Sequence, residues 1–96
     1  MQSDTDKVRK AGRAVGRVQK VFFRRFVQAA ANHRGVTGWV KNMSDGSVTM
    51  ELQASAQIIR QLVARIKKGR GRIRVDSLEL SDLPVVKGED KFAIKY

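Results

Sequence analysis

The stretch from residue 16 to residue 24 has residue types that could bind a phosphate-sized anion. It reads Gly16-Arg17-Val18-Gln19-Lys20-Val21-Phe22-Phe23-Arg24 and lies between a strand-like segment and the start of a helical pattern. A short turn that leads into a helix leaves several backbone N–H groups without intrahelical partners. Together with the positive end of the helix dipole, those donors favour an anion such as phosphate.

Arg24 is the side chain that could complete such a site. It falls in the first turn of the expected helix, where side chains lean back toward the helix N-terminus, so its guanidinium would face the anion. Arginine also matches phosphate oxygens with two parallel hydrogen bonds. On these residues alone, an ordinary strand-to-helix connection with an exposed arginine stays equally open, because the loop lacks the GK[ST] sequence of a nucleotide-binding P-loop.

Two helices are expected from hydrophobic periodicity. In residues 21–33, Phe22, Phe26 and Ala30 recur at helical spacing, as do Phe23, Val27 and Ala31, and Gly35 supplies a stop. The lone histidine, His33, falls in the last turn and is expected on the surface. The second helix begins after the N-cap residue Ser55 and carries an apolar stripe formed by Ile59, Leu62, Val63 and Ile66.

The remaining chain predicts strands around these helices. Residues 7–15 are expected to be a strand from the topology more than from propensity, because Gly12 and Arg13 suit a central strand poorly. Further strands are expected at residues 36–43, 48–54, 73–80 and 92–96, with an Asp45-Gly46 hairpin turn and a phase slip near Ser77. The order βαββαβ plus a short last strand predicts an α+β, ferredoxin-like α/β sandwich: a mostly antiparallel sheet with two helices on one face.

Composition sets the class of protein and its range of partners. Ninety-six residues make one small domain, expected at 7–96 after a disordered tail at 1–6, and there is no cysteine. The formal net charge is +11, and ten Lys or Arg residues lie between Lys7 and Ser44 with no carboxylate among them. Such a field attracts anionic ligands and nonspecific nucleic acid alike. With no signal-peptide pattern and no membrane-length apolar run, we expect a cytoplasmic, basic protein without a membrane partner. We expect a monomer, because the sequence shows no obvious apolar face for self-association.

The chain also resembles a known family. Gly16-x-Val18-Gln19-x-Val21-x-Phe23-Arg24, Gly38-Trp39-Val40-Lys41-Asn42, Asp45-Gly46-x-Val48 and the final Phe-x-Ile-x-Tyr are similar to the acylphosphatases, from about Val15 to Tyr96. The resemblance implies hydrolysis of acyl phosphates to a carboxylate and phosphate, with Arg24 and Asn42 catalytic. Asn42 would orient the attacking water, since a neutral amide can both donate and accept. The implied phosphate-binding residues are Gly16, Val18, Gln19, Lys20, Val21 and Phe22.

The implied mechanism needs neither a cofactor nor a metal. The leaving carboxylate has a pKa of about 4, so its departure requires no strong general acid. Loop N–H groups and Arg24 would stabilise the phosphoryl oxygens, and phosphoryl transfer depends mostly on such positioning and electrostatics. Inorganic phosphate is expected as product and inhibitor. The sequence does not specify which acyl phosphate is the physiological substrate.

Lys20 is the departure from the family pattern, which has glycine at this position. A lysine resists positive φ at a cost of about 1–2 kcal/mol. We expect either a strained loop with retained but reduced activity, or a distorted loop that binds phosphate and hydrolyses slowly or not at all. Two alternatives therefore stay open. One is a non-catalytic phosphate-binding relative, and the other is a basic nucleic-acid-binding module. The RNA-recognition motif shares the βαββαβ order, but the strand at 48–54 lacks its base-stacking aromatics.

Overall fold

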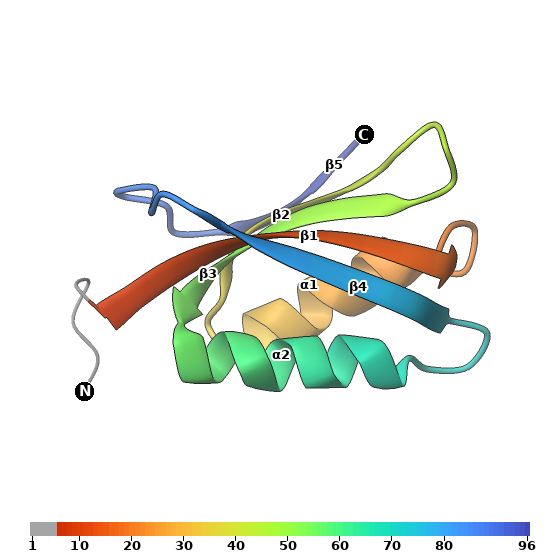
Figure 1. Ribbon diagram of the computed structural model, residues 1–96, viewed down its shortest axis with the longest axis horizontal. Helices are drawn as coiled ribbons and strands as arrows, with labels where there is room; N and C mark the ends of the chain where they lie inside the picture. The colour runs from red at the N-terminus through yellow and green to blue at the C-terminus, as the bar shows by residue number, and fades with distance from the viewer. Residues whose placement is uncertain (1–5) are drawn as a thin grey trace.

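Residues 6–96 form a five-stranded sheet with two helices (Figure 1). The computed structural model describes residues 6–96, so most of the predicted tail at 1–6 lies outside the described residues. In chain order the elements are β1 Lys7–Arg17, α1 Phe23–His33, β2 Thr37–Asn42, β3 Val48–Ser55, α2 Ala56–Lys68, β4 Arg74–Leu83 and β5 Phe92–Lys95. Neither helix has the length and apolar character to span a lipid bilayer.

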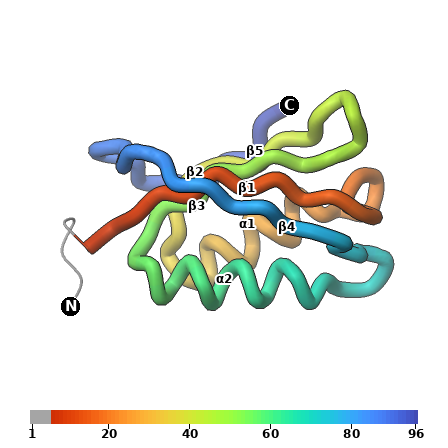
Figure 2. Tube along the Cα trace, in the orientation of Figure 1, coloured from red at the N-terminus to blue at the C-terminus, as the bar shows by residue number. Residues whose placement is uncertain are grey.

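The strands lie side by side in the order β4-β1-β3-β2-β5. Every neighbouring pair is antiparallel except β2 and β5, which run parallel. Both helices cover the same face of the sheet, as Figures 1 and 2 show. This arrangement confirms the predicted ferredoxin-like sandwich.

The core fills the space between that face and the helices. Alternate residues of β3, Val48, Met50 and Leu52, are fully buried, as the strict alternation in the sequence predicts. The helices contribute Phe23, Val27 and Ala31 from α1, and Ile59, Leu62 and Ile66 from α2. The predicted cap of α2 is also present, because the Ser55 hydroxyl accepts a hydrogen bond from the Ile58 N–H at 3.2 Å.

The start of α1 differs from the sequence prediction. The helix begins at Phe23 rather than at Val21, because Lys20 and Phe22 both have φ near +60° and hold the chain out of the helical conformation. Phe22 was expected on the apolar stripe of the helix, but its residue is 78% exposed. That part of the prediction was wrong, since periodicity alone does not reveal a left-handed backbone.

The phase slip in β4 is a bulge. Val15 pairs with Ser77 and the next residue of β1, Gly16, pairs with Val75, so Asp76 is the extra residue on β4. The slip was predicted near Ser77. The strand continues to Leu83, three residues beyond the predicted end, and Pro84 then follows it.

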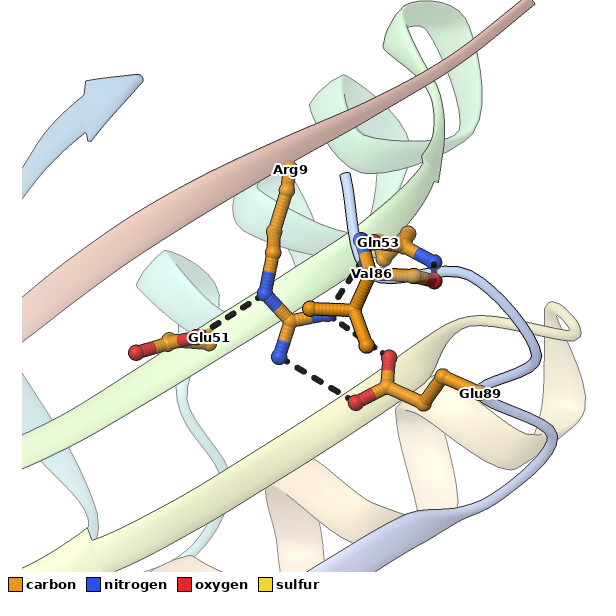
Figure 3. A network of polar contacts seen from close by, with 5 residues as sticks. All are labelled: Arg9, Glu51, Gln53, Val86 and Glu89. Carbon is orange, nitrogen blue, oxygen red and sulfur yellow. Dashed lines mark hydrogen bonds and ion pairs between the residues drawn. The ribbon is translucent and has the colours of Figure 1, made fainter. Parts of the chain in front are cut away.

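An arginine network ties the segment between β4 and β5 to the sheet (Figure 3). Arg9 of β1 is only 3% exposed and donates to Glu51 at 2.8 Å, to Gln53 at 3.1 Å and to both carboxylate oxygens of Glu89. The Gln53 side-chain amide in turn donates to the Val86 carbonyl oxygen and accepts from the Val86 N–H. The network therefore links β1, β3 and the chain that leads into β5.

Candidate active site

The connection from β1 to α1 begins with a close approach between two strands. Gly16 has φ of 137°, and a Cβ built on it would lie 2.2 Å from the carbonyl oxygen of Arg74 in β4. Glycine is therefore required here by the β4 bulge. The structure places Gly16 inside the sheet, where it fixes the direction in which the chain leaves β1.

Two side chains then hold the loop in place. Val18 is 1% exposed and packs in the core. The side-chain amide of Gln19 donates to the carbonyl oxygens of Met43 at 2.7 Å and Ser47 at 2.9 Å, which belong to the β2–β3 hairpin. Asp45 stabilises that hairpin by accepting from the Ser47 N–H at 2.9 Å. The loop and the end of β2 are thus joined directly.

The backbone of residues 20–25 offers unpaired donors. The N-cap residue Phe22 makes no side-chain hydrogen bond to the helix, and the first turn of α1 holds no acidic residue. The first helical bond is from Phe26 N to Phe22 O at 3.0 Å. Within residues 6–96, none of the N–H groups from Lys20 to Arg25 has an acceptor. Such a set of donors at a helix N-terminus suits an anion.

Arg24 is positioned by the C-terminal part of the chain. Its Nη1 donates to the carbonyl oxygen of Lys95 at 3.2 Å, and its Cζ lies 4.8 Å from the centre of the Tyr96 ring. One hydrogen bond leaves most of the guanidinium's donors available, because arginine has five N–H groups. Sequence reasoning missed this role of Tyr96, although the tyrosine belongs to the recognised Phe-x-Ile-x-Tyr ending.

Asn42 lies at the end of β2, opposite Val48 of β3. Its Oδ1 is buried, and it has no hydrogen-bond partner within the described residues. A buried amide oxygen without a partner is unfavourable by about 1–3 kcal/mol unless water or a ligand satisfies it. The position therefore points to a bound molecule beside Asn42.

These groups line one hollow of about 380 Å³. Its lining is Val18, Lys20, Phe22, Phe23, Arg24, Arg25, Asn42, Ile94 and Tyr96. The hollow is lined by three cationic side chains and by no acidic side chain. Of the residues predicted from the sequence, Val18, Lys20, Phe22, Arg24 and Asn42 come together here, whereas Gly16, Gln19 and Val21 do not line it.

The hairpin next to the hollow carries one strongly perturbed acid. Hydrogen bonds from the Ser47 hydroxyl and backbone N–H, and a further one from Arg13, hold the pKa of Asp45 well below its ordinary value. The negative charge of Asp45 is thereby paired with Arg13 at 2.9 Å, and it is not among the residues that line the hollow. Asp45 therefore does not oppose the cationic side chains that line the hollow.

Comparison with known proteins gives the family. A family model for acylphosphatase matches residues 10–94. The chain belongs to the acylphosphatase family.

Relatives and solved structures agree with this assignment. An acylphosphatase of Clostridium beijerinckii is 46% identical over 81 residues, which cover 84% of this chain and 90% of that protein. The crystal structure of acylphosphatase from Bacillus subtilis is 31% identical, superimposes with a TM-score of 0.87 and covers 93% of this chain and 99% of that one. An acylphosphatase structure from Coxiella burnetii is 28% identical with a TM-score of 0.88, and the alignment covers 98% of both chains. The activity is the hydrolysis of acyl phosphates, as the resemblance implies.

Proposed function

We propose that the hollow between the 18–23 connection and β2 binds the phosphoryl group of an acyl phosphate and directs a water molecule onto it. The single observation that carries this assignment is the unpartnered, buried Oδ1 of Asn42 in the same hollow as Arg24. An acceptor without a partner can orient the hydrogen of an attacking water. The guanidinium and the free N–H groups of residues 20–25 would bind the phosphoryl oxygens.

The chemistry proceeds in one displacement. Water held by Asn42 attacks phosphorus, the P–O bond to the acyl group breaks, and the electron pair leaves with the carboxylate. The leaving carboxylate needs no protonation near neutral pH, because the pKa of a carboxylic acid is about 4. The proton of the attacking water passes to solvent or to the phosphate product. Inorganic phosphate would occupy the same donors and act as a competitive inhibitor.

Lys20 adds to the site in two opposing ways. Its backbone has φ of 60°, so the loop has the left-handed conformation that glycine would adopt there more easily. Its side chain also belongs to the lining of the hollow and adds a positive charge. We propose that the enzyme is active with this lysine, at a lower rate than a variant with glycine at position 20.

The test separates binding from turnover. The wild-type enzyme is expected to hydrolyse benzoyl phosphate without added metal and to be inhibited by phosphate. Arg24→Ala should lower kcat/KM by about 100-fold or more and weaken phosphate inhibition, since it removes contacts to the phosphoryl oxygens. Asn42→Ala should lower kcat similarly but keep phosphate inhibition within about twofold, because phosphate binding does not require the positioned water.

Two exposed residues outside the hollow provide matched controls. Arg60→Ala on α2 removes one arginine, and Asn32→Ala on α1 removes one amide; neither residue lines the hollow. Near-normal activity of Arg24→Ala would contradict the mechanism. Phosphate inhibition of the wild-type protein without hydrolysis of benzoyl phosphate would instead identify a non-catalytic phosphate-binding relative.

The open face of the sheet disfavours the nucleic-acid alternative. On the central strands β1 and β3, the face away from the helices carries Arg9, Ala11, Arg13, Thr49, Glu51 and Gln53, of which Arg9 and Gln53 are buried, and none of the six is aromatic. Arg9 and Arg13 there are paired with carboxylates. A monomeric state and a cytoplasmic location stay predictions from the sequence, and sedimentation velocity tests the first of them.

A further inference from the structure

A second hollow lies directly beside the phosphate site. It has a volume of about 510 Å³, within the range of about 300–1,000 Å³ typical of small-molecule sites. It is bounded by the start of α1 and by the turn that joins α2 to β4, which lie at the same end of the molecule (Figures 1 and 2). Its apolar lining includes Val21, Phe26 and Ile73, each of which packs partly buried against the core.

The two hollows are neighbours. Lys20, Phe22 and Arg25 line both of them, whereas Asn42 lines only the first. In an in-line displacement the attacking and leaving oxygens lie on opposite sides of phosphorus. A water beside Asn42 would therefore direct the leaving acyl group away from Asn42. The second hollow adjoins the first and is not lined by Asn42, so it is available to the acyl group.

The charges around the second hollow are all positive and unpaired. Its lining includes Lys20, Arg25, Arg70 and Arg72, and no carboxylate. Within residues 6–96 none of these four makes an ion pair, although Arg9, Lys10, Arg13 and Arg74 do. An apolar floor with a cationic rim is complementary to a ligand with an apolar body and an anionic end.

The turn that joins α2 to β4, which carries Arg70 and Arg72, is held in shape by its own backbone contacts. Within it, the Ile73 N–H donates to the Arg70 carbonyl oxygen at 3.0 Å. A Cβ on Gly69 would lie 2.6 Å from the Ile73 carbonyl oxygen, so only glycine allows the backbone at 69 and 73 to approach this closely. Arg65 connects the turn to the floor: its Nη1 donates to Gly69 O at 3.3 Å and its Cζ lies 5.0 Å from the Phe26 ring centre. The backbone of the turn and the apolar floor are therefore fixed relative to each other before a ligand binds.

We propose that this second hollow is the acyl-group subsite, and that it selects acyl phosphates whose acyl group has an apolar or aromatic body and a second anionic group, a carboxylate or a phosphate, at its far end. The inference rests on the proposed function, because it requires the phosphoryl group to occupy the first hollow. Arg70 and Arg72 bind the distal anion, and Phe26 and Ile73 contact the body.

The experiment compares three substrates of the purified enzyme: acetyl phosphate, benzoyl phosphate and 4-carboxybenzoyl phosphate. For the wild-type enzyme, kcat/KM for 4-carboxybenzoyl phosphate should exceed that for benzoyl phosphate by about tenfold, the factor expected of one charge-assisted contact. In the double variant Arg70→Ala/Arg72→Ala this preference should disappear. The value for acetyl phosphate, which does not reach the subsite, should stay within about twofold.

Lys67→Ala/Lys68→Ala is the matched control. It removes the same net charge from exposed positions at the end of α2 that line neither hollow. The wild-type preference should survive in it. If this control loses the preference equally, or if the arginine variant lowers kcat/KM for all three substrates by the same factor, the arginines act only through net charge and the subsite is refuted.

The same three substrates distinguish failure of the proposed function from failure of the acyl subsite. A wild-type enzyme that hydrolyses none of the three substrates would overturn the proposed function itself. Hydrolysis of acetyl phosphate with equal kcat/KM for benzoyl and 4-carboxybenzoyl phosphate would overturn the subsite alone. Because both arginines are exposed on a turn, urea unfolding of the double variant should match the wild-type midpoint, which separates a substrate effect from misfolding.

Discussion

At the scale of single residues, the loop depends on two non-glycine residues with a left-handed backbone. Lys20 and Phe22 both have φ of 60°, a conformation that is unfavourable by about 1–2 kcal/mol for residues with a Cβ. Such strain persists only where the surroundings fix the chain. Here Val18 in the core and the two hydrogen bonds of Gln19 fix it.

Comparing glycine with alanine at position 20 isolates this strain. Both variants remove the ammonium group, and they differ only in the Cβ. In ordinary helical positions alanine is the more stable by about 1 kcal/mol, but at positive φ the order should reverse, with Lys20→Gly more stable than Lys20→Ala by about 1 kcal/mol. Urea unfolding measures the difference.

The same pair of variants tests activity. We expect kcat/KM for benzoyl phosphate to be higher in Lys20→Gly than in Lys20→Ala, because glycine relieves the strain of the loop that is proposed to bind phosphate. An alanine variant that equals or exceeds the glycine variant in both stability and activity would show that position 20 does not have positive φ in the working enzyme.

At the scale of elements, the C-terminal end of the chain positions Arg24, the arginine proposed to bind the phosphoryl group. The strand pairs in parallel with β2, and the Arg24 guanidinium bonds to Lys95 O and lies against the Tyr96 ring. The same end of the chain fixes the sheet edge, because Lys95 Nζ lies 4.4 Å from the centre of the Trp39 ring. The orientation of the Arg24 side chain therefore depends on Lys95, which lies 71 positions later in the sequence.

Truncating the aromatic ring should loosen Arg24. Tyr96→Ala removes a cation–π contact worth about 0.5–1 kcal/mol at an exposed site, so kcat/KM for benzoyl phosphate should fall about two- to fivefold. Tyr96→Phe keeps the ring face and should retain the wild-type value. A Phe variant as impaired as the Ala variant would assign the effect to the hydroxyl instead of the ring.

The sequence predicts the elements better than it predicts the loop. Periodicity placed the apolar stripe of α2 and the alternation of β3 correctly, since each pattern reflects one buried face. It did not reveal that α1 starts at Phe23, because the positive φ of Phe22 results from contacts that Val18 and Gln19 make with distant parts of the chain. The partners of Gly16, Arg24 and Arg9 also lay out of reach, as each comes from another strand or the segment before β5.

At the scale of the whole molecule, Arg9 joins distant parts of the chain. Replacing Arg9 leaves Glu51 and Glu89 without their cation, and breaking a buried ion pair from one side is unfavourable by about 3–5 kcal/mol. Because Glu51 and Glu89 are partly exposed, we expect Arg9→Ala to lower the free energy of unfolding by about 3 kcal/mol in urea titrations. Arg74→Ala breaks only an exposed pair and should change it by less than about 1 kcal/mol.

The same network should make stability depend on pH. Burial of Glu89 opposes its ionisation, but hydrogen bonds from Arg9 and Thr37 and the charges of Arg9 and Lys95 outweigh that effect, so its pKa lies below the ordinary value. A carboxyl whose pKa is lowered by folding stabilises the protein above its unfolded pKa, about 4.3 for glutamate. This stabilisation is lost as the pH falls from that value through the folded pKa.

The high net charge should increase the loss of stability at low pH. The chain has 20 Lys and Arg against nine Asp and Glu, so protonation of the carboxyls adds positive charge to a molecule that is already at +11. Urea midpoints at pH 7 and pH 3 should therefore differ in the wild-type protein, and the difference should be smaller in Glu89→Gln. That variant should also be less stable at pH 7, because it has lost the ion pair with Arg9.

Glu79→Gln, at an exposed position of β4, should keep the wild-type difference between the two urea midpoints. If Glu89→Gln were as sensitive to acid as the wild type, the coupling between Glu89 and Arg9 would contribute nothing to folding.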